Sequence, residues 1–278
     1  MLCSAPDCDL RVLIFIPFFL VGCSGQSQQH SSAVRAPAPA KPTVETTATT
    51  TPSVPGIVRW ETVPPLTHDV AIMESVFWEP ADTDSLRARI FETQQIRGSR
   101  VLEIGTGSGL ISLCCLQAGA ANVVATDLNP KAIQNVQYNA TTFEASGRLD
   151  ARLVSRRDVS AWSVIRPDEQ FDFVISNPPW ENNKPKTVAE FALFDPNFLL
   201  LDSLVKGARQ RLLPDGRMWL AYGCVTAIRR VELKAREEHL RCVRLDDRSL
   251  EQLSELFLPG MLLEISIPAK GEREVSAP

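Results

Sequence analysis

Four short segments carry residues whose chemistry suits ligand binding, and each follows an apolar run typical of a buried strand. The first is the loop Gly105-Thr106-Gly107-Ser108-Gly109, which follows the run from Val101 to Ile104. Glycines let a backbone approach a ligand closely, and a helix after such a loop presents unpaired N–H groups. The order strand, glycine turn, helix is that of a nucleotide-cradling βα unit. The loop therefore predicts a nucleotide-type binding site.

Two acids follow at the expected ends of the next strands. Asp127 ends the apolar run that begins at Asn122, and an acid at the tip of a second strand is placed to accept both hydrogen bonds of a ribose diol. Asp158 stands where a third strand, which we expect over residues 153–159, would end. We interpret Asp127 as a ribose ligand and Asp158 as a contact to the edge of a base.

The fourth segment is the tetrapeptide Asn177-Pro178-Pro179-Trp180, directly after the apolar run Phe171 to Ser176. Neither proline has an N–H to donate, so the strand cannot continue through them. The prolines stiffen the turn and leave the Asn177 side chain and nearby carbonyls at the strand tip. There they are placed to accept hydrogen bonds from a ligand.

In this order, the motifs resemble those of class I S-adenosylmethionine-dependent methyltransferases. The loop is of the G-x-G-x-G kind, and the Asn-Pro-Pro-Trp tetrapeptide resembles the N-P-P-[aromatic] motif of enzymes that methylate planar nitrogens. Glu79-Pro80-Ala81 resembles a segment of the release-factor glutamine methyltransferases, with Asp82-Thr83 approximating its acid-threonine pair. The resemblance covers roughly residues 60–268 and includes the small methyltransferase-domain family.

The resemblance implies a set of site residues and the cofactor S-adenosylmethionine. The cofactor-binding residues would be Glu103, Gly105, Thr106, Gly107, Gly109, Asp127, Leu128, Asp158 and Asn177. The acceptor would be bound by Asn177, Pro178, Pro179, Trp180, Asp82 and Thr83. The catalytic set would be Asn177, Pro178 and Trp180, with the Asn177 oxygen and the Pro178 carbonyl each accepting one N–H and Trp180 stacking on the flat acceptor.

Three functions stay open. The favoured one is methylation of a protein glutamine amide, as in a release factor. The first alternative is methylation of an exocyclic amine of adenine or guanine in RNA or DNA. The second is a tethered binding domain that has lost catalysis. Trp180 replaces the usual tyrosine of the glutamine methyltransferases, and a linker takes the place of their helical substrate-binding domain.

Composition bounds these alternatives. The 278 residues are 44% hydrophobic and carry a net charge of only −4, which suits one well-buried α/β domain and gives no support to sequence-independent nucleic-acid binding. The seven cysteines and three histidines form no C-x-x-C or Cys/His cluster, so we expect no metal site. The sequence does not predict an oligomeric state.

The first 56 residues differ in composition from the rest of the chain, and we expect them to lie outside the folded domain. Residues 1–23 resemble a signal segment with a lipoprotein cleavage box ending at Cys23, and residues 24–56 form a Ser/Thr/Ala/Pro linker that we expect to be disordered. If Cys23 is lipidated, the protein is a membrane-anchored lipoprotein. If translation starts downstream, it is cytoplasmic. The methyltransferase domain would then span residues 57–268, with a tail at 269–278.

Strands alternating with helices predict a doubly wound, seven-stranded, mostly parallel sheet of the Rossmann-like methyltransferase kind, with a disordered N-terminal segment. The resemblance implies an antiparallel last strand. We expect a short helix between residues 64 and 75. The other expected helices span residues 85–93, 129–138, 196–213 and 225–238, and the late strands span 217–222, 240–245 and 261–267.

Overall fold

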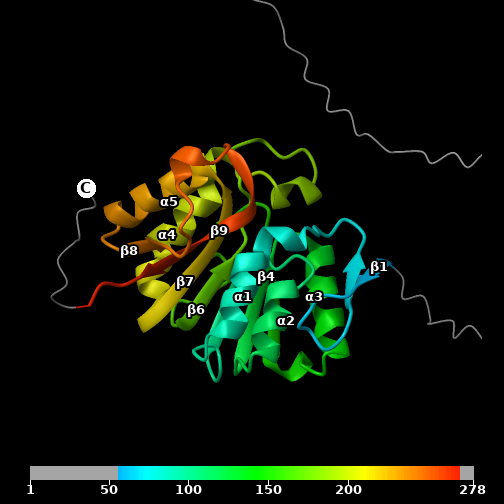
Figure 1. The fold of residues 1–278 in the computed structure, drawn as a ribbon. Helices are drawn as coiled ribbons and strands as arrows, with labels where there is room; N and C mark the ends of the chain where they lie inside the picture. Colours follow the sequence, from blue (N-terminus) through cyan, green and yellow to red (C-terminus); the bar gives the residue numbers. More distant parts are fainter. Residues whose placement is uncertain (1–55, 270–278) are drawn as a thin grey trace, which may run out of the picture. The chain divides into compact units, whose positions relative to one another are not determined.

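A central sheet dominates the fold of residues 56–269, which are the residues that the computed structural model describes (Figure 1). Its seven strands lie in the order β5-β4-β3-β6-β7-β9-β8. They are β3 (Arg100–Ile104), β4 (Asn122–Asp127), β5 (Leu149–Leu153), β6 (Phe171–Ser176), β7 (Leu212–Cys224), β8 (Arg241–Arg244) and β9 (Leu256–Ser266). Neighbouring strands from β5 to β7 pair in parallel, whereas β9 is antiparallel to both β7 and β8. The predicted doubly wound sheet and its antiparallel last strand are confirmed.

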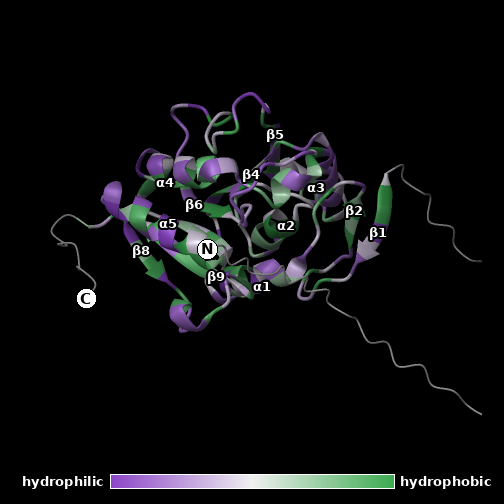
Figure 2. Ribbon diagram, turned by 90° about the horizontal axis from the view of Figure 1, so that it is seen from above, coloured by the Kyte–Doolittle hydropathy of each residue, from purple (hydrophilic) through white to green (hydrophobic). Residues whose placement is uncertain are grey.

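Helices cover both faces of this sheet, because its central strands are apolar on both sides. The α-helices are α1 (Asp84–Glu92), α2 (Leu110–Gln117), α3 (Pro130–Thr142), α4 (Leu199–Arg211) and α5 (Val225–Glu237). The 3-10 turns are η1 (Pro80–Thr83), η2 (Ser146–Arg148), η3 (Ala189–Ala192), η4 (Pro196–Phe198) and η5 (Leu250–Gln252). Within β3, Val101 packs with α1 and α2, and the next residue, Leu102, packs with α4 and α5. Figure 2 shows the apolar strands at the centre and polar residues along the loops.

The segment before α1 differs from the predicted short helix, and that prediction is wrong. Two strands, β1 (Ile57–Glu61) and β2 (Val70–Met73), instead form an antiparallel two-stranded sheet. Two buried side chains of α3 hold β2: Asn139 Oδ1 accepts from the Ala71 N–H at 2.9 Å, and Asn135 Oδ1 accepts from the Met73 N–H at 2.8 Å. These distant amides satisfy the backbone groups of β2, which local sequence cannot reveal.

The third strand is also displaced from its predicted position. β5 spans Leu149–Leu153, so Asp158 lies five residues beyond its end, in an exposed turn. Elsewhere the predicted elements are present with small boundary shifts. α3, for example, begins at Pro130, and the Asn129 side chain caps it by accepting from the Lys131 N–H at 3.0 Å.

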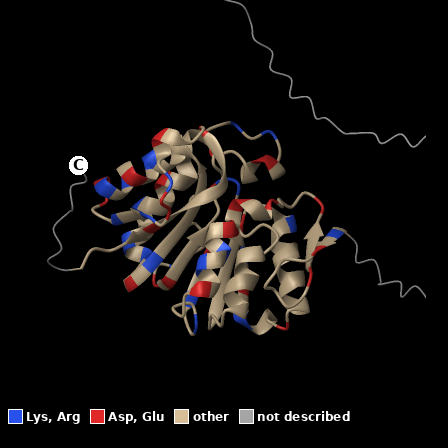
Figure 3. Ribbon diagram, viewed as in Figure 1, with Lys and Arg blue, Asp and Glu red and all other residues tan. Residues whose placement is uncertain are grey.

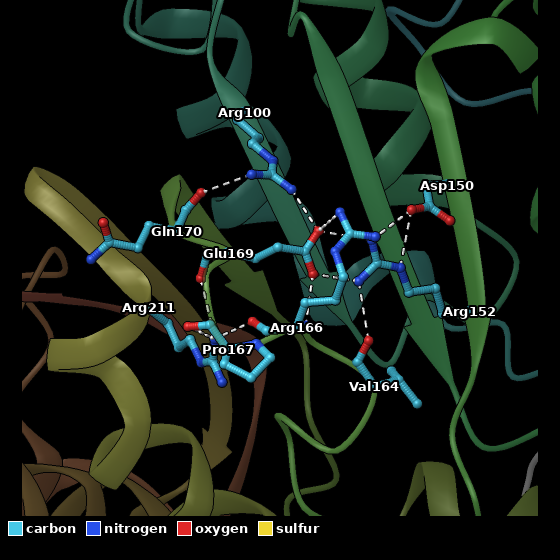
Figure 4. Close-up of polar contacts among 9 residues, drawn as sticks. All are labelled: Arg100, Asp150, Arg152, Val164, Arg166, Pro167, Glu169, Gln170 and Arg211. Atoms are coloured by element: carbon cyan, nitrogen blue, oxygen red, sulfur yellow. Dashed lines mark hydrogen bonds and ion pairs between the residues drawn. The ribbon is translucent and has the colours of Figure 1, made fainter.

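A buried acid ties the amino ends of two strands together (Figure 4). Glu169, directly before β6, is only 2% exposed. Its carboxylate pairs with Arg152 at 2.7 Å, with Arg100 at 2.6 Å and with Arg166 at 2.9 Å. These hydrogen bonds, Arg152 first, hold the pKa of Glu169 down at about 2. The cluster fixes the loop of residues 154–170 to the sheet.

The predicted signal-like segment, the lipidation site Cys23 and the linker up to residue 55 lie outside the described residues, as do residues 270–278 of the predicted tail. Within residues 56–269, no helix is long and apolar enough to cross a membrane.

Candidate active site

A cavity runs along the carboxyl ends of β3, β4 and β6, the edge where parallel α/β sheets bind ligands. The glycine loop, Asp127 and Asn177 all line this one cavity. It is closed on the other side by apolar side chains of the segment between β6 and α4. The wall of that segment consists of Val188, Ala189, Phe191, Ala192 and Phe194. We call this space the cofactor cavity.

The glycine loop and Asp127 form one unit in the cofactor cavity. Asp127 Oδ2 accepts from the Gly107 N–H at 2.9 Å, and its Oδ1 accepts from the Asn129 N–H at 2.8 Å. Burial raises the pKa of the Asp127 carboxyl, and the backbone donors oppose that rise. Each oxygen keeps a lone pair beyond these bonds, so the carboxylate can accept the hydroxyls of a diol.

Glu103, near the carboxyl end of β3, is 3% exposed and lines the same cavity. Its Oε2 accepts from the Thr106 hydroxyl at 2.7 Å, from the Ser112 N–H at 3.0 Å and from the Ser112 hydroxyl. Burial raises the pKa of Glu103 to about 7 in spite of these donors. All three donors are neutral, so the negative charge of the carboxylate has no positive partner among them. A cationic ligand group would supply that positive charge.

A second cavity adjoins the first, and Asn177 lines both, together with Phe77, Glu79 and Ala192. We call it the acceptor cavity. It is also lined by Asp82, Pro178, Trp180, Glu181, Leu193, Leu256, Phe257 and Leu258. Three of its lining residues are acids and none is Lys or Arg. Leu193, Leu256 and Leu258 are 42%, 46% and 59% exposed, so its rim is apolar.

Asp82 is an acid of the acceptor cavity with a perturbed pKa. Burial and the charge of Glu79 raise the pKa and an interaction with the Asn177 side chain lowers it, which together bring it to about 6. Asn177 is also fixed by Trp180, because Trp180 Nε1 donates to Asn177 Oδ1 at 3.2 Å. The side chain that was predicted to bind the acceptor is therefore held by Trp180 and lies in the same cavity lining as Asp82.

Most predicted residues line one of the two cavities. The cofactor cavity is lined by Thr83, Glu103, Gly105, Thr106, Gly107, Asp127, Leu128, Asn177 and Pro179. The acceptor cavity is lined by Asp82, Asn177, Pro178 and Trp180.

Two predicted cofactor ligands line neither cavity. Gly109 instead serves packing, because a Cβ there would lie 2.6 Å from Cγ2 of Val136 on α3. Asp158 is exposed, and its carboxylate accepts from the Ser160 N–H at 3.2 Å. Its neighbours Val159 and Ser160 line the cofactor cavity in its place.

Several residues that line the two cavities were not predicted as site residues from the sequence. Phe77 lies within two residues of Glu79-Pro80-Ala81, so that motif marks its neighbourhood. Leu193 and the stretch Leu256 to Leu258 carry no motif, and only the antiparallel pairing of β9 brings the latter to the site.

Comparison with protein families decides the classification. Residues 83–236 match the model of the methyltransferase small domain. The chain belongs to the methyltransferase small domain family. The matched residues include the glycine loop, Asp127 and the Asn-Pro-Pro-Trp tetrapeptide.

Curated relatives of this family member act on different acceptors. The chain is 32% identical over 169 residues to a release factor glutamine methyltransferase of Bordetella pertussis, covering 56% of this chain and 60% of the relative. It is 30% identical over 124 residues to a tRNA1(Val) (adenine(37)-N6)-methyltransferase of Shewanella halifaxensis, covering 44% of this chain and 49% of the relative. It is also 30% identical over 135 residues to a bifunctional methyltransferase of Rickettsia conorii, covering 44% of this chain and 25% of the relative. The chain thus spans between 25% and 60% of the length of these relatives, which is less than two thirds of each.

Solved structures share the fold. A ribosomal protein L11 methylase from Lactobacillus delbrueckii subsp. bulgaricus superimposes with a TM-score of 0.51 at 18% identity, covering 70% of this chain and 82% of that one. A T. thermophilus 16S rRNA methyltransferase in complex with AdoMet and guanosine gives a TM-score of 0.51 at 19% identity, covering 78% of this chain and 52% of that one. At these identities the likeness establishes the architecture.

The residues present fit S-adenosylmethionine, the cofactor of this family. A Cβ at Gly105 would project into open space beside the cofactor cavity, so the backbone borders the ligand volume. The half-buried Asp127 carboxylate suits the ribose diol, and the buried Glu103 carboxylate, surrounded by neutral donors, suits the methionine amine. Among the described residues no group of three or more His, Cys, Asp or Glu side chains is arranged to hold a metal ion.

Proposed function

We propose that the protein transfers a methyl group from S-adenosylmethionine to a planar nitrogen, the side-chain amide nitrogen of a protein glutamine. The observation that carries this proposal is the position of Asn177, which lines both the cofactor cavity and the acceptor cavity. A group at that junction can hold an acceptor nitrogen against the methyl donor.

The chain's contribution to the reaction is alignment. When bound, the cofactor supplies an electrophilic methyl group on a sulfonium. An amide nitrogen is a poor nucleophile, because its lone pair is delocalised into the carbonyl. Asn177 Oδ1 and the Pro178 carbonyl can each accept one of its N–H groups, which holds the nitrogen for in-line attack. Such alignment is worth roughly 7–11 kcal/mol for well-oriented groups.

The charges of the acceptor cavity favour a protein over a nucleic acid. Glu79, Asp82 and Glu181 line it, and no Lys or Arg is among its lining residues. A phosphodiester close to three carboxylates would be repelled, whereas a neutral peptide amide would not. The leucine rim suits apolar side chains that flank the accepting glutamine.

Over residues 56–269, the surface outside the cavities carries charges of both signs and no field that reverses this preference. Figure 3 shows Lys and Arg interspersed with Asp and Glu over the described elements. Four arginines lie within or close to β5, namely Arg148, Arg152, Arg156 and Arg157. Of these, Arg152 pairs with Glu169, and Arg148 Nη1 donates to the carbonyls of Leu116 and Ala120 at 3.0 Å each. Two of these four arginines are therefore engaged within the fold.

Labelling decides among the acceptors. The purified chain is incubated with methyl-tritiated S-adenosylmethionine and either bacterial release factor or total RNA, with a release factor whose accepting glutamine is changed to glutamate as the matched control. We expect label in the release factor and none in the control. Label in RNA alone would overturn the glutamine assignment in favour of an amine of adenine or guanine.

Calorimetry addresses the alternative of a tethered binding domain that has lost catalysis. We expect S-adenosylhomocysteine to bind, and Asp127→Ala to abolish that binding, because Asp127 is placed to hold the ribose. Failure of the unaltered chain to bind would refute the proposed activity.

The lipidation of Cys23 stays a prediction. Mass spectrometry of the native N-terminus tests it: a diacylated Cys23 peptide supports membrane anchoring, and a start within the linker supports a cytoplasmic enzyme.

A further inference from the structure

The environment of Trp180 does not suit the predicted role of stacking on a flat acceptor. Its indole ring lies in a slot formed by two backbone segments of β7 and β9. A Cβ at Gly223 would lie 2.3 Å from the ring atom Cζ3, and a Cβ at Gly260 would lie 3.3 Å from Cζ2. The absence of side chains at these two glycines is what lets the ring lie against the sheet.

Two hydrogen bonds fix the ring within that slot. The indole Nε1–H is shared between the Ala221 carbonyl at 3.1 Å and Asn177 Oδ1 at 3.2 Å. An indole nitrogen only donates, so the Asn177 oxygen, and not its amide nitrogen, must face Trp180.

Asp82 lines the acceptor cavity together with Asn177, and an interaction with the Asn177 side chain lowers the pKa of its carboxyl. An ionised carboxylate only accepts, so this interaction involves the Asn177 Nδ2 group. The contacts with Trp180 and Asp82 are therefore compatible with one orientation of the amide. In that orientation the oxygen keeps one lone pair for an incoming N–H.

We propose that Trp180 is a positioning residue, which orients the Asn177 amide through its indole N–H and does not stack on the acceptor. Asp82 adds a second interaction with the same amide. The Asn177 oxygen then presents a lone pair at the junction of the two cavities without any reorientation when the acceptor arrives. The kinetic part of this proposal rests on the proposed function, but the orientation of the amide does not.

The chain supplies a matched control for the indole N–H. Trp162 Nε1 donates to the Ser203 carbonyl at 2.6 Å, and its ring also lies against a glycine, Gly207 of α4. Trp162 lines neither cavity. Trp162→Phe therefore removes a comparable hydrogen bond and leaves Asn177 untouched.

The first test observes the amide directly by 15N NMR of the whole chain. In Trp180→Phe we expect the two Asn177 Nδ2 proton resonances to shift and converge as the amide gains rotational freedom, whereas Trp162→Phe leaves them in place. Asn177→Ala reports the same bond from the other end: the Trp180 Nε1 resonance should move and that of Trp162 should not. Unchanged Asn177 resonances in Trp180→Phe, or an unchanged Trp180 resonance in Asn177→Ala, would overturn the proposal.

The second test is kinetic and uses release factor as acceptor. We expect Trp180→Phe to lower kcat about tenfold, the scale of one lost hydrogen bond, while the affinity for S-adenosylhomocysteine is unchanged. A stacking role predicts instead that phenylalanine preserves kcat, because it keeps an aromatic face. If the NMR shifts are seen but release factor is not methylated, the glutamine assignment fails and the positioning role stands.

Discussion

Two glutamates of this protein are almost equally buried and differ in nearly everything else. Glu103, near the carboxyl end of β3, is 3% exposed, and Glu169, before the amino end of β6, is 2% exposed. The pKa of Glu103 is raised to about 7, mainly by desolvation, and that of Glu169 is lowered to about 2, mainly by the hydrogen bond from Arg152. Burial alone therefore does not set the protonation state of either carboxyl group.

The partners explain the difference. Glu169 meets three guanidinium groups, which fully compensate its charge, so the cluster is complete without a ligand. Glu103 meets only hydroxyls and one backbone N–H, which leave its charge without a cationic partner. The first carboxylate is structural. The second lies in the cofactor cavity, where perturbed acids commonly mark function.

Breaking the structural cluster should have the largest effect. Glu169→Gln leaves Arg100 without its counter-ion and Arg152 with only the exposed Asp150, so we expect the free energy of unfolding to fall by about 3–5 kcal/mol. Urea unfolding followed by circular dichroism measures this. Glu61→Gln, which removes an exposed pair with Arg59, should cost no more than about 1 kcal/mol. Equal losses in the two variants would show that the buried cluster is not special.

The same substitution at the other glutamate should act on the ligand. Glu103→Gln keeps an oxygen to accept from Ser112 and Thr106 but removes the charge. We expect the dissociation constant of S-adenosylhomocysteine to rise roughly 10- to 100-fold, the scale of a charge-assisted hydrogen bond. Isothermal titration calorimetry measures it. An unchanged affinity, with the fold intact, would exclude Glu103 as the partner of the amine.

The two carboxyls should also give opposite dependences of stability on pH. The lowered pKa of Glu169 contributes stability above about 4.5, which is lost as the pH falls toward about 2. The raised pKa of Glu103 contributes stability below about 4.5, which is lost as the pH rises through about 7. Melting temperatures between pH 4 and 8 should therefore decline less steeply in Glu103→Gln than in the unaltered chain. An identical slope in both would contradict the raised pKa of Glu103.

The smallest expected effect is the release of protons when the cofactor binds. The raised pKa of Glu103 favours its protonated form, and pairing with the cofactor amine favours the charged form, so binding near neutral pH should release part of a proton. Calorimetry in buffers of different ionisation enthalpy measures this release. It should vanish in Glu103→Gln, and its persistence there would assign the proton to another group, such as Asp127.

Local sequence was sufficient wherever one element carries its own signal. The apolar runs of β3, β4 and β6, the glycine loop between β3 and α2, and the proline at the start of α3 each express their structure over a few residues. Asp127 and Asn177 could be placed because each directly follows or ends such a strand. Parallel strands then bring their carboxyl ends to one edge, so a shared cavity followed from the order of the motifs.

Sequence reasoning failed where a residue's role depends on a partner far along the chain. The segment before α1 forms β2 because Asn135 and Asn139 of α3 satisfy its backbone. Gly109 has the spacing of a ligand-binding glycine but serves the packing of α2 against α3. Asp158 was expected at a strand end that the structure places five residues earlier.

The sequence by itself determined the family, the cofactor and the strand tips that carry Asp127 and Asn177, because those depend on short apolar runs and the residues that end them. Only the tertiary structure decided what surrounds each of these groups. The opposite pKa shifts of Glu103 and Glu169, the leucine rim from β9, and the orientation of Asn177 by Trp180 and Asp82 all arise from contacts between distant segments. Electrostatic and hydrogen-bonding energies depend on separations of a few ångströms, and folding creates those separations.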